Sequence, residues 1–386
     1  DPHYLQINPI HDMSIGLEGT VAHDAHFHAN HQWRYVQAKQ STCLGQILEK
    51  APDWLPLITA TRVIVSEYPK GKAAEFPPAY SEDVIPESLR NRALTAGIDV
   101  RILSLGRSGG LDKEAEPSDN AFLAMIGAAQ TVIRCSLQDV GPMCWPGTKR
   151  PLPGTSWPKP LLAALAEAIW ARGVDVQIIL SNPDSVPGGL EGPMATPYSN
   201  GWTCAEVASE IIKEIRKRHA DADALRKVVE ENLFVCYLRH FAAGDGYKWE
   251  NDVPLGLHDK HFIIDDVCCY IGSQNLYVCD LAEWGVVIDS AAETKLIMQQ
   301  YWDRAWACSF QGIDCDVQEV MDGLDVDREP PKMPLFPSRR TREVLVQAEC
   351  SRARVGTHSH NPGIYSRQRK QAAAAVAATG TPQLEP

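Results

Sequence analysis

Residues 256–289 read GLHDKHFIIDDVCCYIGSQNLYVCDLAEWGVVID, and this stretch carries charged side chains inside apolar runs that are typical of buried strands. His258 is followed by Lys260 two positions later and by Asp265 after four more residues, and Gly-Ser-x-Asn then brings Ser273 and Asn275. Residues two apart on a strand lie on the same face, so His258 and Lys260 are expected to point to one side.

Asp265 and Asp266 are expected to form a two-residue turn between strands 258–264 and 267–273. In that register residue 264 faces residue 267, and His258 lies opposite Ser273, with Asn275 on the same face just beyond the strand. The hairpin would bring an imidazole, an ammonium, a hydroxyl and an amide together. Such a set suits phosphoryl transfer, because the imidazole attacks phosphorus or protonates a leaving oxygen while the other groups stabilise the phosphate oxygens.

Glu283, just past the hairpin, is a candidate for orienting an imidazole ring, and the chemistry needs no metal or cofactor.

The composition agrees with a soluble globular protein: of 386 residues, 44% are hydrophobic and 22% are charged. The net charge of −12 argues against broad nucleic-acid binding. No apolar run approaches the roughly 20 residues of a transmembrane helix.

The eleven cysteines show no CxxC pair and no zinc spacing, so they leave both a secreted and a cytoplasmic location open. Between residues 118 and 310, helix patterns alternate with strand patterns. The expected helices are 119–130, 159–173, 204–219, 221–232 and 291–307, and the expected strands include 131–137, 174–180 and 233–239. This order predicts an α/β fold, with a mixed, mostly parallel sheet flanked by helices. Residues 326–386 are expected to form a disordered tail because they show no sustained apolar period.

The segment 12–33 repeats the order of the segment 283–306: an acidic residue, a strand, a turn of small residues, a helix and a Trp. Asp12 matches Glu283 in this alignment. Residues 4–33 are therefore expected to close a first repeat, and the part equivalent to 258–275 is expected to precede residue 1. We expect the chain to be truncated there.

The sequences HDKHFIID and IGSQN resemble the HKD motif of the phospholipase D superfamily. The continuation GSQNLYVCDLAEWGVVID resembles the second motif of the secreted bacterial and fungal type, and the similarity extends from about Ser118 through Trp306. The resemblance implies two α/β lobes that each supply one HKD motif to a shared site. It also implies that the His of the first motif forms a phosphohistidine and that the His of the second motif is the general acid.

By this resemblance, His258 is the second-motif His, and Lys260 and Asn275 bind the phosphate. Ser273 supports them, and Asp265 has a structural or electrostatic role. The acidic residue after each motif is expected to orient the His of the other repeat.

Asp12 would therefore support His258, and Glu283 would support the missing nucleophile.

The chain departs from the family because it has no first HKD motif. The amino-terminal histidines spread over about 200° of a helical wheel, which favours a polar surface helix over a zinc site; they are His23, His26, His28 and His31.

The predicted domains are a remnant of the first lobe with an irregular linker (1–117), the second lobe (118–325) and the tail (326–386). The predicted function is a phospholipase D-type phosphodiesterase that hydrolyses or transphosphatidylates phosphatidylcholine-like lipids at a membrane or micelle surface, and that is inactive alone if the first motif is missing. One alternative is a nuclease that dimerises to complete its site. Another is a non-catalytic protein that binds phosphorylated ligands.

Overall fold

The computed structural model describes residues 10–19, 21–29, 32, 100–108, 117–145, 148–151, 155–182, 185, 202–219, 221–240, 254–276 and 282–327. All of them belong to one compact unit, Asp1–Pro330. Most of the expected linker and nearly all of the expected tail lie outside the described residues.

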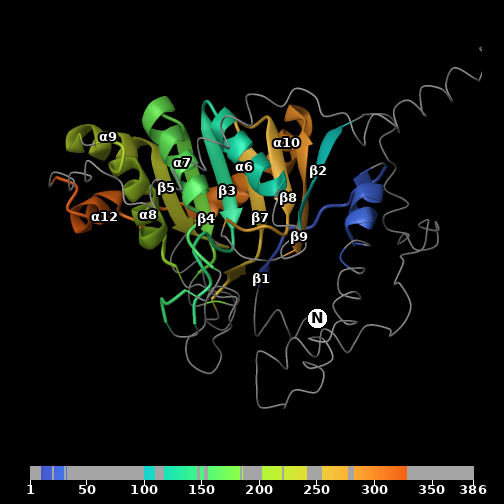
Figure 1. The fold of residues 1–386 in the computed structure, drawn as a ribbon, viewed down its shortest axis with the longest axis horizontal. Helices are drawn as coiled ribbons and strands as arrows, with labels where there is room; N and C mark the ends of the chain where they lie inside the picture. Colours follow the sequence, from blue (N-terminus) through green and yellow to red (C-terminus); the bar gives the residue numbers. More distant parts are fainter. Residues whose placement is uncertain are drawn as a thin grey trace, which may run out of the picture. The chain divides into compact units, whose positions relative to one another are not determined.

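A seven-stranded sheet forms the centre of this unit (Figure 1). Its order from edge to edge is β2-β9-β8-β7-β3-β4-β5. The strands are β2 (Arg101–Ser108), β3 (Val132–Leu137), β4 (Asp175–Leu180), β5 (Leu233–Tyr237), β7 (Lys260–Ile264), β8 (Cys268–Gly272) and β9 (Ala282–Asp289). Two short strands, β1 (Ile10–His11) and β6 (Gly256–Leu257), pair separately.

The sheet is mixed. Strands β3, β4 and β5 are parallel to one another. The other four pairings, β2–β9, β9–β8, β8–β7 and β7–β3, are antiparallel. The α/β fold with a mixed sheet flanked by helices is therefore confirmed, but the expected parallel majority is wrong. Parallel neighbours need a helical crossover, whereas β7, β8 and β9 follow one another through shorter connections, which favour antiparallel pairing.

Helices cover both faces of the sheet (Figure 1). The first face carries α6 (Pro117–Ala128), α7 (Lys159–Arg172), α8 (Cys204–Arg216) and α9 (Ala222–Asn232), and α12 (Val317–Gly323) packs with them. The second face carries α10 (Ala291–Ile297), the π-helical turn η5 (Met298–Trp302) and α11 (Asp303–Ser309) in one continuous run. None of the described helices is both long and apolar enough to cross a bilayer.

Apolar side chains that alternate between the two faces of the strands form two hydrophobic clusters, one on each side of the sheet. Ile178 and Leu180 of β4 belong to the cluster under α6–α9, while Ile179 between them belongs to the cluster under η5 and α11. Successive side chains of a strand point to opposite faces, so a strand buried on both sides is apolar throughout. The second cluster includes the fully buried Trp302 of η5.

The elements predicted between residues 118 and 310 are confirmed, and their ends follow local rules. Helix α7 ends at Gly173, which adopts a left-handed φ of 61°, and its N–H donates to the Ile169 carbonyl. Helix α8 begins with a capping box, in which Thr203 and Glu206 each accept a hydrogen bond from the other's backbone N–H.

Two predicted boundaries are wrong. Residues 101–108, assigned to the irregular linker, form β2 and pair along their whole length with β9. Val326, assigned to the tail, is 3% exposed in the core, and the adjacent Asp327 forms an ion pair with Arg226 at 2.7 Å. In both cases the partner comes from a distant part of the chain, which the composition of the segment does not reveal.

The amino-terminal segment agrees with its prediction only in part. Residues 21–29 are helical, as expected, but residues 12–18 form no regular strand. Ile15 and Leu17 are instead partly buried against the cluster on the second face of the sheet. The proposed repeat relation to residues 283–306 stays a prediction.

Candidate active site

Buried polar side chains gather at one edge of the sheet. In Figure 1 this is the lower edge, near β1. Strands β2, β3, β4, β5 and β8 end at this edge, and β7 and β9 begin there. Buried polar groups are costly unless they are paired or used, so their concentration here indicates a functional site. They are Arg107, Ser136, Gln138, Asp139, Ser181, Asn182, Arg239, Asp259, Lys260, Gln274, Asn275 and Glu283.

His258 follows β6 directly and contacts Asp12. Strand β6 pairs in parallel with β1, and the His258 N–H donates to the His11 carbonyl at 2.8 Å. His258 Nδ1 then lies 2.9 Å from Asp12 Oδ2. Because Nδ1 is engaged, Nε2 is the ring nitrogen that can exchange a proton with a ligand. The structure thus brings together Asp12 and His258 as expected, while their catalytic roles stay predictions.

The Asp12 carboxyl is held in its ionised form. Partial burial raises its pKa, but the hydrogen bond with His258 and the positive charge of Lys260 outweigh that effect and leave the pKa below its ordinary value. An ionised carboxylate at this position can hold the imidazole in one tautomer and stabilise its protonated form.

Lys260 is the first residue of β7 and is 7% exposed. Its Nζ donates to the His258 carbonyl at 2.5 Å, which places the ammonium beside the histidine backbone. Burial lowers the pKa of Lys260 to about 8, against the opposing effect of the nearby carboxylates of Asp12 and Asp259. The ammonium is therefore still mostly charged at neutral pH and can bind an anionic oxygen.

The register of the hairpin differs from the prediction by one residue. Ile264 pairs with Cys268 rather than with Val267, and the loop has three residues, 265–267. A shift of one residue exchanges the two faces of a strand, so the expected pairing of His258 with Ser273 is wrong. The physical reason is the turn: Asp265 and Asp266 both adopt left-handed φ values, 51° and 59°, and Val267 extends the loop by one residue.

Ser273 and Asn275 hold the end of β8 in place. Ser273 Oγ accepts a hydrogen bond from the Trp284 N–H at 3.1 Å, and its own N–H donates to the Trp284 carbonyl at 3.0 Å. Asn275 is 2% exposed, and its Nδ2 lies 3.4 Å from Gln138 Oε1 at the end of β3. Ser273 thus joins β8 to β9, and Asn275 lies at the polar edge near the end of β3.

Glu283 is buried and belongs to a network that no sequence pattern indicates. Arg107 Nη1 lies 3.0 Å from Glu283 Oε2, and Arg107 Nη2 lies 2.5 Å from Asp119 Oδ1. Gln274 Nε2 donates to Asp119 at 2.8 Å. Burial raises the pKa of Glu283 to about 7, although Arg107 opposes the shift. The role expected for Glu283, supporting a histidine of another repeat, stays a prediction.

Asp259, between His258 and Lys260, forms a second network that was not predicted. Its buried carboxylate accepts hydrogen bonds from Ser136 Oγ at 3.1 Å and from the Tyr301 hydroxyl. His11 Nδ1 lies 3.5 Å from Asp259 Oδ1. Burial lowers the pKa of His11, but the hydrogen bond and charge of Asp259 outweigh it, so the pKa lies above its ordinary value. No sequence signal marks these residues, because Asp259 occupies a variable position of the motif.

Asp265 lies at the opposite end of β7 from His258. Its carboxylate accepts hydrogen bonds from the backbone N–H groups of Gln130, Thr131 and Val132 at 2.9, 2.8 and 3.0 Å. Burial raises its pKa, but these hydrogen bonds outweigh burial and hold the pKa below its ordinary value. These contacts join the β7–β8 loop to the start of β3, and the structural or electrostatic role expected for Asp265 stays a prediction.

The amino-terminal histidines form no metal site in the part of the chain described here, where no cluster of three or more His, Cys, Asp or Glu side chains is suitably placed. His28 Nδ1 is instead close to β2, 2.8 Å from where a Cβ on Gly106 would lie. His28 also contacts Gln32. His31 lies outside the described residues.

No family model matches the chain. Among curated proteins, phospholipase D from Streptomyces antibioticus is 29% identical over 199 residues. The match covers 50% of this chain and 32% of the relative, so this chain spans only part of the relative's length. The chain is thus similar to a phospholipase D over half of its own length.

Solved structures with some likeness to this chain are of low similarity. NucT from Helicobacter pylori shows 15% identity and a TM-score of 0.32, over 54% of this chain and 99% of that one. Nuc from Salmonella typhimurium, a phospholipase D family member, shows 17% identity and a TM-score of 0.30, over 55% and 97%. Phosphatidylserine synthase from Haemophilus influenzae shows 12% identity and a TM-score of 0.35, over 70% and 50%.

Proposed function

We propose that the polar edge of the sheet forms half of a two-histidine phosphodiesterase site. The observation that carries the proposal is the hydrogen bond between Asp12 and His258, 2.9 Å long, with Lys260 anchored on the His258 carbonyl. This arrangement places an oriented imidazole and an ammonium side by side at the polar edge of the sheet. Asn275, at the same edge, adds an amide that binds a phosphate oxygen.

The proposed reaction has two steps. A histidine nucleophile attacks phosphorus, and His258 gives the proton on Nε2 to the oxygen of the leaving alcohol, so that a phosphohistidine forms as the ester bond breaks. Neutral His258 then takes a proton from water as the water oxygen attacks phosphorus, which releases the phosphomonoester and the nucleophile. Lys260 stabilises the negative charge on the non-bridging oxygens in both steps.

This scheme needs a second histidine. The His-x-Lys-x4-Asp pattern occurs once in the chain. The nucleophile is therefore supplied by a second lobe or by a second copy of the chain, and Glu283 is the candidate to orient it.

The proposed substrate is a glycerophospholipid at a membrane or micelle surface. Two observations support a lipid: the curated relative is a phospholipase D, and the net charge of −12 disfavours a long polyanionic nucleic acid. Transfer of the phosphatidyl group to another alcohol is the same second step with that alcohol in place of water.

Hydrolysis assays test the proposal directly. Release of the alcohol from phosphatidylcholine vesicles should fall by about 10²-fold or more in His258→Ala, because the general acid is lost. His23→Ala, which removes an exposed histidine on the helix at 21–29, is the matched control and should keep the wild-type rate. Cleavage of plasmid DNA but not of lipid would show that the proposed substrate class is wrong.

A binding assay tests the phosphate site without turnover. Tungstate, an inorganic mimic of phosphate, should bind to the chain in calorimetry and should bind at least about tenfold more weakly to Lys260→Ala. Equal tungstate affinity in the two proteins would contradict the assignment of Lys260 to the phosphate.

A further inference from the structure

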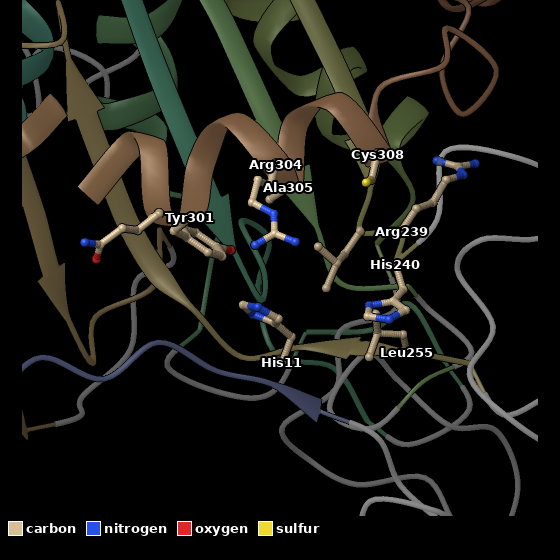
Figure 2. Close-up of a pocket in the computed structure, with 10 residues that line it drawn as sticks. His11, Arg239, His240, Leu255, Tyr301, Arg304, Ala305 and Cys308 are labelled. Atoms are coloured by element: carbon tan, nitrogen blue, oxygen red, sulfur yellow. The ribbon is translucent and has the colours of Figure 1, made fainter. Parts of the chain in front are cut away.

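A cavity of about 260 Å³ lies beside β1, between it and the run from η5 to α11 (Figure 2). Its apolar wall includes Leu238, Leu255 and Ala305. Its polar lining includes His11 from β1, His240 from the segment after β5, and Arg304 from α11. None of the residues assigned above to phosphate binding lines it, so the cavity is distinct from the Lys260 site.

The lining is basic. Figure 2 shows the Arg304 guanidinium and the rings of His11 and His240 directed into the same space. Arg304 forms no hydrogen bond or ion pair with any of the residues described. Arg239, in contrast, is held by Asp314, with Nη1 and Nη2 at 2.5 and 2.6 Å from its carboxylate oxygens.

No carboxylate belongs to the described lining of the cavity. His11 lies 3.5 Å from the Asp259 carboxylate, whose oxygens also contact Ser136 and Tyr301. A basic cavity is unexpected in a chain with a net charge of −12. It therefore indicates a local attraction for an anionic group.

The cavity and the proposed general acid are joined through one peptide unit. His11 lines the cavity, its carbonyl accepts the His258 N–H, and the next residue, Asp12, holds the His258 ring. In the proposed reaction His258 protonates the leaving alcohol. The substrate part nearest this cavity is therefore the leaving alcohol.

We propose that this cavity binds an anionic substituent, a carboxylate or a phosphate, on the leaving alcohol of the substrate. The inference rests on the proposed function and deepens it by naming the headgroup class. The volume of about 260 Å³ is slightly below the 300–1,000 Å³ range of sites for drug-sized ligands and suits a small headgroup. Arg304 would attract an anionic headgroup and repel the quaternary ammonium of choline.

A specificity assay tests this assignment. The rates on vesicles of phosphatidylserine, whose headgroup carries a carboxylate, and of phosphatidylcholine are measured for the chain and for Arg304→Gln. The serine-to-choline rate ratio should fall by about tenfold or more in Arg304→Gln, because a charge-assisted contact is lost. Arg101→Gln is the matched control: it removes the same charge from an 84% exposed side chain at the far end of β2, and the ratio should not change.

A second measurement separates failure of this inference from failure of the proposed function. Calorimetry measures the affinity for glycerol 3-phosphate of Lys260→Ala and of Lys260→Ala/Arg304→Gln. Both variants lack Lys260, so binding at the catalytic phosphate site is weakened in both. The double variant should bind at least about tenfold more weakly. If no lipid is hydrolysed but this difference appears, the anion site stands and the proposed reaction fails. Equal binding by the two proteins, or a rate ratio that Arg304→Gln leaves unchanged, would overturn the inference.

Discussion

Replacing Asp265 by alanine is expected to lower the free energy of unfolding by about 3 kcal/mol, although Asp265 belongs to the signature motif. The carboxylate accepts hydrogen bonds from the N–H groups of Gln130, Thr131 and Val132, and also from Thr131 Oγ1 at 2.8 Å. Hydrogen bonds to a charged group contribute about 1.5–3 kcal/mol each when they are buried. Here Gln130 and Thr131 are exposed, so water replaces part of the loss, and about 2 kcal/mol remains for the whole set.

The remaining part of the loss comes from the backbone. Asp265 has a φ of 51°, in the left-handed region that alanine tolerates less well than aspartate, which adds about 1 kcal/mol. Asp266 has a φ of 59° and is the matched control. Asp266→Ala carries the same backbone cost but loses only a half-buried ion pair with Arg134, at 2.9 Å, so we expect about 1.5 kcal/mol for it.

The pH dependence identifies the cause. The folded pKa of Asp265 is below its ordinary value, so the contribution is present above the unfolded pKa and is lost as pH falls through the folded pKa. The difference in unfolding free energy between wild type and Asp265→Ala should therefore be constant between pH 5 and 7 and shrink below about pH 4. Urea denaturation followed by tryptophan fluorescence measures it. Equal destabilisation by Asp265→Ala and Asp266→Ala would refute the reasoning, as would a difference that does not change with pH.

Two further changes test the site and the packing around it. The pKa of Lys260 is about 8, so tungstate binding should weaken as the pH rises through 8 and the ammonium loses its proton. Calorimetry from pH 6 to 9.5 measures this change. A tungstate affinity that stays constant over this range would argue against a role for Lys260. Gly272→Ala should lower the free energy of unfolding by about 1–3 kcal/mol, because its Cβ would lie 2.2 Å from the Tyr270 hydroxyl and 2.6 Å from Gly285 Cα. The control is Gly127→Ala in α6, where an added Cβ would have no atom within 4 Å. This variant should be neutral or stabilising by about 0.5–1 kcal/mol in the same urea denaturation. A loss of stability equal to that of Gly272→Ala would contradict the packing argument.

Local patterns in the sequence determined the type and order of the elements between residues 118 and 310. The apolar period of 159–173 and the terminal Gly173 predicted α7, and the apolar runs of 174–180 and 233–239 predicted β4 and β5. The alignment of Asp12 with Glu283, together with the family resemblance, also predicted that Asp12 would lie beside His258. The predictions of α7, β4 and β5 succeeded because each depends on neighbouring residues.

Tertiary structure decided the features that depend on partners far apart in the sequence. The register of the β7–β8 hairpin follows from the three-residue loop, whose Asp265 is fixed by the start of β3. Arg107 lies in the site because its strand, β2, pairs with β9, although the sequence of β2 predicted a linker. Asp259 became the centre of a buried network because Tyr301 approaches it from the π-helical turn on another element. Burial and hydrogen-bond pairing between distant segments set these contacts, and no local pattern records which segments will meet.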